Sequence, residues 1–296
     1  MVARIAPRAS ALARWQADHV AGLLTAADPA CAVEVVPLST EGDRRTDVPL
    51  SEIGGKGVFA TEVQAALLDG RADVAVHSAK DLPARTPDGL VLAAVPERGD
   101  PRDALVGCRL VDLPTDGVVA TGSARRRVQL AHLRPDLRFA ELRGNMATRL
   151  EKAAAFDAIV VAAVAFERLG WADRLADVLP DTLLVPQVAQ GALAVECRDD
   201  RDDLRALLAR IEHGPSRIAV DAERGFLDEL GGDCTLPAGA HATLLDDGLV
   251  RVRGILGGEP DADGRTPVHH AVEVGADGPG AGRALAARLR ARLTAA

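Results

Sequence analysis

In the first third of the chain, short apolar runs typical of strands alternate with segments whose apolar residues recur at helical spacing. Short apolar runs bounded by turn residues predict strands at 32–38, 73–78 and 89–95. Between them, the one-sided spacing of Val63, Ala66 and Leu67 predicts a helix over 61–69 that ends at Gly70. Alternating strands and helices of this kind predict an α/β lobe.

The same alternation begins again after a segment rich in proline, glycine and charge at 96–103, which we interpret as a hinge. Such a repeat of βα units predicts a second lobe, and in both lobes a mainly parallel sheet with ligands at the carboxyl ends of its strands. The predicted elements are strands at 117–120, 137–142 and 157–164 and helices over 124–133 and from 146.

The remaining sequence predicts a return to the first lobe and then a small α+β domain. A strand is predicted at 187–196 and a helix at 198–213. After Gly214 and Pro215 come a predicted helix, a glycine-rich loop at 231–242, two alternating antiparallel strands and a final amphipathic helix. We therefore expect three domains: residues 1–96 with 190–213, residues 97–189, and residues 214–296.

Composition narrows the class of protein. The 296 residues include 48% hydrophobic and 26% charged residues, which is typical of a globular chain. A net charge of −8 and 2% aromatics argue against nucleic-acid binding, which uses basic surfaces and stacking side chains. No apolar stretch approaches the roughly 20 residues of a membrane span, and the N-terminal segment lacks the apolar core of an export signal.

The four cysteines stand at 31, 108, 197 and 234, without a CxxC pair or a histidine at ligand spacing. This pattern favours reduced thiols in a cytoplasmic protein, with neither a zinc site nor a disulfide framework. Cys31, Cys108 and Cys197 lie in or beside apolar runs and are expected to be inert. Cys234 differs, because glycines and a proline surround it. It is either a nucleophile on an exposed loop or an incidental loop cysteine.

Arginines gather where two of the predicted helices begin. Arg125 and Arg126 stand in the first turn of the helix over 124–133, where Ser123 is the expected N-cap. Arg143 and Arg149 flank the start of the next helix, with Asn145 as its expected cap. Cations are disfavoured at a helix N-terminus unless an anion is bound there. The clusters predict a polyanionic ligand, with a solvated surface stripe as the alternative.

The segment HSAKDLP at 77–83 ends a predicted strand with polar residues. Asp81 is placed to hold a protonated nitrogen or a cationic intermediate, and Lys80 to bind an acid group; a solvated Lys–Asp pair is the alternative. His77 is expected to be structural, because no other histidine offers it a metal partner. The loop GGKG at 54–57 lacks the length and the Ser/Thr of a nucleotide-binding loop, so ATP binding is not expected.

Seven segments together resemble one family. RIAPRASALARWQA, IGGKGVFATEVQAALLDGRADVAVHSAKDLP, ERGDPRDALV, TGSARRRVQL, LRGNMATRL, QGALAVECR and LGGDCTLPAGAHA are similar to motifs of the porphobilinogen deaminases (hydroxymethylbilane synthases), in the family's order over about residues 4–243. The resemblance implies a cytoplasmic, monomeric transferase of porphyrin biosynthesis. Such an enzyme joins four porphobilinogen molecules into the linear tetrapyrrole hydroxymethylbilane and releases ammonia.

The resemblance also implies a fold and a cofactor. The fold would be two periplasmic-binding-protein-like lobes around a cleft, plus a C-terminal α+β domain. A covalent dipyrromethane primer, made from two porphobilinogens, would be attached through Cys234. Porphobilinogen carries an acetate and a propionate, so a growing pyrrole chain accumulates the negative charge that arginines bind. The implied partners are porphobilinogen and the growing chain, with no nucleic acid, membrane or metal.

Residue roles follow by motif. Asp81 would contact pyrrole nitrogens and stabilise the azafulvenium cation left by ammonia. The implied primer-binding residues, besides Cys234 and Asp81, are Lys80, Ser123, Arg125 and Arg126. The implied ligands of substrate or growing-chain carboxylates are Arg8, Ser10, Arg143, Arg149 and Arg168. Lys56 and Phe59 would belong to a loop beside the cleft.

The chain departs from the family pattern at Ala11, Glu41, Ala79, Gly122 and Ala189. Gly122 replaces a second hydroxyl residue, which predicts one weaker carboxylate contact, and Glu41 replaces the usual arginine. Two alternatives remain. A two-lobed solute-binding protein for a small polycarboxylate would need export, and an inactive relative would have no need of Asp81 and Cys234.

Overall fold

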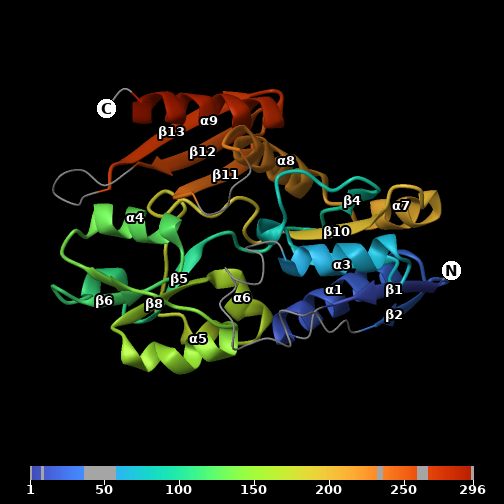
Figure 1. Ribbon diagram of the computed structural model, residues 1–296, viewed down its shortest axis with the longest axis horizontal. Helices are drawn as coiled ribbons and strands as arrows, with labels where there is room; N and C mark the ends of the chain where they lie inside the picture. Colours follow the sequence, from blue (N-terminus) through green and yellow to red (C-terminus); the bar gives the residue numbers. More distant parts are fainter. Residues whose placement is uncertain (1, 8–9, 37–57, 232–235, 259–265, 295–296) are drawn as a thin grey trace. The chain divides into compact units, whose positions relative to one another are not determined.

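The computed structural model describes residues 2–7, 10–36, 58–231, 236–258 and 266–294 (Figure 1). The chain divides into two compact units, and each is discontinuous in sequence. Unit 1 contains Met1–Arg98 and Ala192–Arg217, and unit 2 contains Gly99–Gly191 and Ile218–Ala296. Unit 2 holds both the expected second lobe and the C-terminal elements. The division into three domains therefore stays a prediction.

Unit 1 is built on a five-stranded sheet in the order β2-β1-β3-β10-β4. β1 pairs in parallel with β2 and β3, while β10 is antiparallel to both β3 and β4. The strands are Val2–Ala6 (β1), Ala32–Val35 (β2), Val74–Ser78 (β3), Leu90–Ala94 (β4) and Leu193–Arg198 (β10). The strand that returns last in sequence thus lies between two strands that come before it.

Helices cover both faces of this sheet. Ala11–Ala27 (α1) and Asp202–Leu208 (α7) bury Val20 and Leu204 against Val74, Val76 and the apolar face of β10. Val58–Leu68 (α3) buries Val63, Ala66 and Leu67 against Ala75 on the other face. The strict alternation along β3 therefore sends successive side chains to different helices. Short 3₁₀ turns occupy Ala79–Asp81 (η1) and Ala209–Ile211 (η5).

Unit 2 has a second five-stranded sheet, in the order β7-β6-β8-β5-β9. β6 is parallel to β7 and β8, whereas β5 is antiparallel to β8 and β9. The strands are Asp103–Gly107 (β5), Val118–Ala120 (β6), Arg138–Ala140 (β7), Ala158–Ala162 (β8) and Asp177–Val178 (β9). The helices are Ala124–Leu133 (α4), Met146–Lys152 (α5) and Ala163–Arg168 (α6), with 3₁₀ turns Leu110–Asp112 (η2), Ala153–Ala155 (η3) and Ala172–Arg174 (η4).

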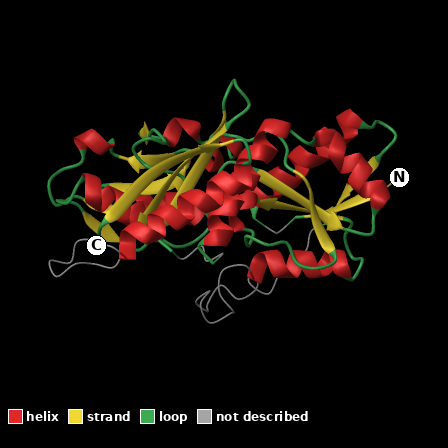
Figure 2. Ribbon diagram, turned by 90° about the horizontal axis from the view of Figure 1, so that it is seen from above, coloured by secondary structure: helices red, strands yellow, loops and turns green. Residues whose placement is uncertain are grey.

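The C-terminal part forms an antiparallel sheet in the order β11-β12-β13, with a long helix lying along it (Figures 1 and 2). Phe226 and Leu285 are fully buried, and a Cβ on Gly254 would lie 2.8 Å from Leu285 Cδ2, so the helix side chains pack closely on β12 at this glycine. The elements are Gly214–Glu229 (α8), Ala238–Leu244 (β11), Val250–Gly257 (β12), Val268–Gly275 (β13) and Gly278–Thr294 (α9).

The expected fold class is confirmed: two α/β lobes and a small α+β portion. The sheets are mixed, because one antiparallel strand in each lobe adjoins the parallel ones. Four local expectations were wrong. The helix predicted at 198–213 begins only at Asp202, because Arg198 still belongs to β10. Residues 187–191 form a turn and the strand starts at Leu193, Asp103 opens β5 within the predicted hinge, and the predicted loop at 231–242 includes the start of β11. At Asp103 and at the start of β11, pairing with a neighbouring strand overrides the local turn residues. At 187–191 the chain turns instead, with Ala189 and Gly191 at positive φ.

No helix in the described ranges combines the length and the apolar character needed to cross a membrane.

Candidate active site

The arginines singled out in the sequence lie at one edge of the unit 2 sheet. Because β7, β6 and β8 are parallel neighbours, the segments that follow them emerge at the same edge. Arg125 and Arg126 follow β6, Arg143 and Arg149 follow β7, and Arg168 follows β8. The fold therefore collects three groups of cations that are separated in sequence.

Both helix caps occur where the sequence predicts them, but they differ chemically. Asn145 caps α5, and its side chain accepts a hydrogen bond from the Thr148 amide at 3.0 Å. Ser123 occupies the N-cap position of α4 with extended backbone angles, but its hydroxyl makes no capping hydrogen bond. Instead, its amide donates to Thr121 Oγ1 at 3.2 Å. The hydroxyl at the start of α4 is thus not used to begin the helix.

Arg125 and Arg126 point into the protein rather than toward solvent, with exposed fractions of 3% and 6%. Arg126 donates from Nε and Nη2 to Asp103 Oδ1 at 3.0 and 2.7 Å, and from Nη1 to the Val160 carbonyl. Arg125 Nη2 lies 2.8 Å from Asp103 Oδ2, and its Nη1 donates to the Val185 carbonyl at 2.6 Å. One buried carboxylate therefore faces two guanidinium groups.

The charges in this cluster do not balance. Arginine is always protonated in proteins, so two cations and one carboxylate leave one positive charge in the interior. Burial opposes ionisation of Asp103, yet Arg125, Arg126 and a hydrogen bond from Gln190 outweigh it and lower its pKa to about 2. Burial, reinforced by Arg126, lowers the pKa of Arg125, while Asp103 acts against it. A bound anion would balance this surplus positive charge.

The residues present fit an anionic cofactor. Within the described part of the chain, the buried Nε of Arg125 has no hydrogen-bond partner. Buried guanidinium donors are normally paired, and carboxylates are their preferred acceptors. A ligand carboxylate would both pair this donor and balance the surplus charge. The acid side chains of a dipyrromethane have this chemistry.

The second arginine group is more accessible. Arg143 is exposed and donates from Nε to Glu141 Oε1 at 3.0 Å, while Arg127 reaches the other oxygen of Glu141 at 3.7 Å. Arg149 is half-buried and donates to the Gly144 carbonyl at 2.8 Å. Exposed pairs of this kind contribute little to stability, so a competing carboxylate can replace Glu141 at small cost.

Arg168, at the end of α6, donates from Nη2 to the Gly191 carbonyl at 2.7 Å. Burial lowers the pKa of this guanidinium to about 10, with Glu167 opposing the shift. The side chain therefore stays charged at neutral pH in a poorly hydrated environment. Such a cation interacts strongly with an incoming carboxylate.

Gly122, where the family has a hydroxyl residue, lies against the next strand segment. A Cβ at this position would be 2.9 Å from the Leu142 carbonyl oxygen and 3.0 Å from Glu141 Oε1. The Leu142 carbonyl belongs to the backbone and cannot move aside as a flexible side chain can. The two backbone segments therefore lie too close together here for a residue with a side chain at position 122. The predicted weaker carboxylate contact at this position stays a prediction.

In unit 1 the fold brings Ser10 and the Lys80–Asp81 turn to one sheet edge. β1 and β3 are parallel neighbours, and the chain leaves their carboxyl ends at these two places. Ser10 caps α1 by accepting from the Ala13 amide at 3.2 Å. Asp81 is exposed and Lys80 half-buried in η1. An exposed carboxylate held in a short turn at the end of a strand is suited to contact a ligand.

Several expected site residues lie outside the described residues: Arg8, Glu41, Lys56 and Cys234. Phe59 falls in α3, and its side chain is also outside them. Of the described cysteines, Cys31 and Cys197 are buried and Cys108 is half-buried, all as free thiols. Burial raises the pKa of Cys197 to about 11, so it is unreactive at neutral pH. No cluster of His, Cys, Asp and Glu in the described ranges is arranged to hold a metal.

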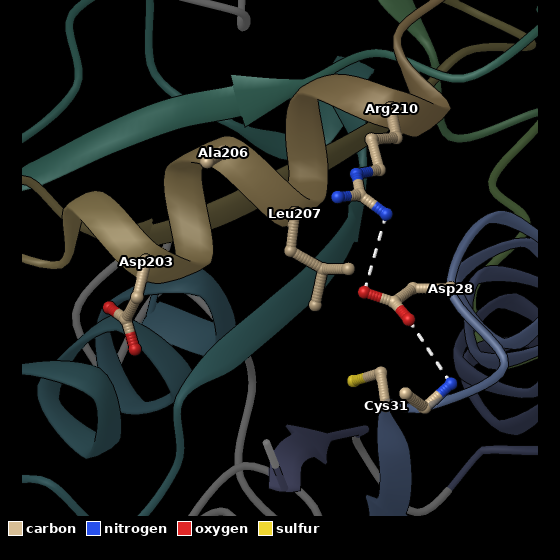
Figure 3. A pocket seen from close by; sticks show the side chains of 7 residues that line it. Asp28, Cys31, Asp203, Ala206, Leu207 and Arg210 are labelled. Carbon is tan, nitrogen blue, oxygen red and sulfur yellow. Dashed lines mark hydrogen bonds and ion pairs between the residues drawn. The ribbon is translucent and has the colours of Figure 1, made fainter.

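Unit 1 also has a pocket of about 170 Å³ (Figure 3). Arg210 and Asp28 both line it, and Arg210 Nη1 lies 3.3 Å from Asp28 Oδ2. None of the residues predicted to bind a ligand lines it. Its small size and surface ion pair give it no evident part in the site.

Sequence reasoning missed the buried partners that hold the site together. Asp103 was grouped with the charged hinge, and Gln190, which donates to Asp103 Oδ1 at 2.9 Å, was placed in a strand. Glu223 accepts from the amides of Ala189 and Ala242 at 2.6 and 2.8 Å, also fully buried. A carboxylate directly before an apolar strand, as in DALVG, was the available signal for Asp103.

Comparisons with known proteins identify the family. The model "Porphobilinogen deaminase, dipyromethane cofactor binding domain" matches residues 3–206, and "Porphobilinogen deaminase, C-terminal domain" matches residues 217–277. The chain belongs to the porphobilinogen deaminase family.

Relatives of this family span most of the chain. The porphobilinogen deaminase of Nitratidesulfovibrio vulgaris (strain Miyazaki F) is 48% identical over 257 residues, 85% of this chain and 81% of the relative. That of Chromobacterium violaceum is 49% identical over 257 residues, 85% and 83% of the two chains. A solved ancestral cationic amino acid solute-binding protein covers 70% of this chain and 86% of its own, at 15% identity and a TM-score of 0.40.

The expected activity is confirmed at the level of the family. The chain is a transferase of tetrapyrrole biosynthesis that acts on porphobilinogen and uses a dipyrromethane cofactor. The solute-binding alternative is not supported, because both family models and the relatives named above are those of porphobilinogen deaminases.

Proposed function

We propose that this chain carries its dipyrromethane primer on Cys234 and extends it by four porphobilinogen units, with ammonia lost at each addition. Water then cleaves the bond between the primer and the four added units, which releases hydroxymethylbilane and leaves the primer on the enzyme. The observation that carries the assignment of residues is the buried Arg125–Arg126–Asp103 cluster, with its surplus positive charge and unpaired Arg125 Nε. When bound, the primer supplies the pyrrole carbon that is joined to substrate. Ser123, Lys80 and the two arginines hold its acid groups.

The arginines outside the buried Arg125–Arg126–Asp103 cluster have a different proposed role. Arg143, Arg149 and Arg168, with Arg8 and Ser10, bind the acetate and propionate groups of incoming substrate and of the growing chain. Support comes from the segments that follow β7 and β8, which carry Arg143, Arg149 and Arg168, and from the exposure of Arg143. Charge-assisted hydrogen bonds to carboxylates orient the substrate for reaction.

Asp81 is the proposed catalytic residue. Loss of ammonia leaves positive charge on the substrate carbon and pyrrole nitrogen, and a fixed carboxylate lowers the energy of that charge relative to neutral substrate. Support comes from its exposure in a short turn that follows a fully paired strand. The same carboxylate orients the pyrrole nitrogen by accepting its N–H.

We also propose that the enzyme is a cytoplasmic monomer with three domains: residues 1–96 with 190–213, residues 97–189, and residues 214–296. The cysteine pattern favours a reducing compartment. Light scattering of the purified protein at several concentrations tests the monomer, which predicts one mass of about 31 kDa throughout.

The mass of the intact protein tests the primer. We expect an adduct equal to two porphobilinogens less two ammonia molecules, absent from Cys234→Ala. Cys108→Ala, which removes a half-buried thiol, is the matched control and should keep the adduct. An active enzyme with an unmodified mass contradicts the assignment, and so does an adduct that survives Cys234→Ala.

A further inference from the structure

The turn that carries Lys80 and Asp81 is held from both faces of the unit 1 sheet. β3 ends at Ser78, and the side chains of Ser78 and His77, being adjacent in a strand, point to opposite faces. Each of the two residues meets a buried polar partner. Polar contacts in an otherwise apolar layer call for an explanation, because burying them without need is costly.

On the face covered by α1, the partner is Gln16. Its Nε2 donates to Ser78 Oγ at 2.8 Å, and the glutamine is 3% exposed. Its helical neighbours Ala17 and Val20 pack into the apolar core below β3. The same helix starts at Ser10, the expected substrate ligand. Gln16 thus connects the start of α1 to the end of β3.

On the face covered by α3, the partner is Glu196 of β10. Its Oε2 accepts from Gln64 Nε2 at 2.9 Å and lies 3.1 Å from His77 Nε2. Glu196 is 0% exposed, Gln64 5% and His77 8%. A single carboxylate oxygen therefore joins α3, β3 and β10. Moving any one of them leaves a buried carboxylate without its partners.

The backbone completes the arrangement. The Ala79 amide, first in η1, donates to the Ala192 carbonyl at 3.0 Å, one residue before β10 begins. β3 and β10 pair through Leu193 with Ser78 and Ala194 with His77. The turn is thus fixed by its backbone and by side chains above and below the sheet, and only Lys80 and Asp81 extend beyond it.

We propose that Glu196 and Gln16 are positioning residues for Asp81. Neither touches substrate: each fixes the end of β3, so that the Asp81 carboxylate, three residues after Ser78 and four after His77, meets the developing charge without rearrangement. This inference rests on the proposed catalytic role of Asp81. Electrostatic catalysis depends on such fixed geometry, and a displacement of about 1 Å can cost about a hundredfold in rate.

The test combines substitutions with single-turnover kinetics on the primed enzyme. Glu196→Gln keeps the shape and an acceptor for Gln64 but removes the charge facing His77. We expect the rate of porphobilinogen addition to fall about ten- to a hundredfold while KM changes less than about twofold. Amide exchange at Ala79 should quicken. Gln16→Leu, on the other face, should give the same pattern and serves if Glu196→Gln does not fold.

Val20→Ala is the matched control, because it removes buried volume from the α1 face without touching the polar contacts. It should lower stability but leave the rate of addition unchanged. The decisive measurement is the pair of double variants with Asp81→Asn. A residue that acts through Asp81 has nothing left to position, so Glu196→Gln and Gln16→Leu should cost no further rate in that background.

The outcomes separate the two claims. If Asp81→Asn adds porphobilinogen as fast as the unaltered enzyme, the proposed role of Asp81 fails. If Asp81→Asn is slow, but Glu196→Gln and Gln16→Leu are as fast as the unaltered enzyme, or their losses multiply with that of Asp81→Asn, the positioning role alone is overturned.

Discussion

Arg125 Nη2 lies 2.8 Å from Asp103 Oδ2, and the two side chains are only 3% and 0% exposed. From the helix dipole, we expected unpaired arginines at the helix N-terminus that would bind an anionic ligand. The structure instead supplies one internal anion, shared between two arginines. The ligand therefore has to neutralise one buried positive charge, rather than the two of a pair of unpaired guanidinium groups.

Asp103 should make stability depend on acid. Its folded pKa of about 2 is below the ordinary value of 3.8, so its stabilising contribution is complete above about pH 5 and is lost as the pH falls toward 2. Asp103→Asn should cost about 3–5 kcal/mol at pH 7, because it leaves buried arginines without their partner. Urea unfolding should show this difference shrinking between pH 5 and pH 2. Asp200→Asn, an exposed partner of Arg198, should change stability little at any pH. A pH-independent deficit in Asp103→Asn would argue against the ionised pair.

The arginines should divide by role. Arg125→Leu should yield mostly unprimed protein by intact mass, because the buried acid groups of the primer lose their partner. Arg143→Leu should keep the primer and slow porphobilinogen addition about ten- to a hundredfold. Arg127→Leu, an exposed arginine in the same helical turn as Arg125, is the control and should be primed and active. If Arg125→Leu is primed normally, the cluster is a structural ion pair that does not bind the primer.

Asp81→Asn should fold normally, but its primed fraction should add porphobilinogen at least about a hundredfold more slowly, since asparagine accepts a hydrogen bond without supplying charge. Asp81→Glu keeps the charge at a displaced reach and should retain part of the activity. Single-turnover measurements on both variants test this. Asp88→Asn removes another exposed carboxylate of unit 1 and should have no effect.

Ala189→Gly should stabilise the protein. Ala189 has φ = 58°, a left-handed conformation that costs a non-glycine residue about 1–2 kcal/mol, and the buried Glu223 holds its amide. Allowing for the greater freedom of glycine in the unfolded chain, we expect a gain of about 1 kcal/mol in urea unfolding, with unchanged activity. Ala192→Gly, at a buried alanine that does not have a positive φ, should instead destabilise. A loss of stability in Ala189→Gly would mean that the alanine methyl contributes more by packing than the strain costs.

Elements with strong local signals were predicted closely. The helix expected over 124–133 is α4, and Asn145 caps α5 as expected, because caps and helical periodicity are properties of a few neighbouring residues. β11 was missed, since its glycine and alanine residues resemble a loop until pairing with β12 is known. Local patterns carry no information about such partners.

The site was predicted in part for the same reason. That arginines would gather at strand ends follows from the order of βα units, and the fold places them so. The burial of Arg125 and Arg126 was not predicted, because it depends on Asp103 and Gln190. These two residues lie well before and well after the arginines in the sequence. His77 was expected to be structural, but its partner Glu196 is 119 residues away along the chain and was not foreseen.

The late return of β10 also bears on how the chain is made. β10 lies between β3 and β4, yet it is synthesised after the whole of the segment Gly99–Gly191. While the ribosome is producing that segment, β3 and β4 lack the strand that lies between them, so backbone N–H and C=O groups along their facing edges are unpaired. The segment Gly99–Gly191 already contains every strand of its own sheet. The middle of the chain can thus complete its sheet before the beginning does, and the first lobe closes only when Leu193–Arg198 has emerged.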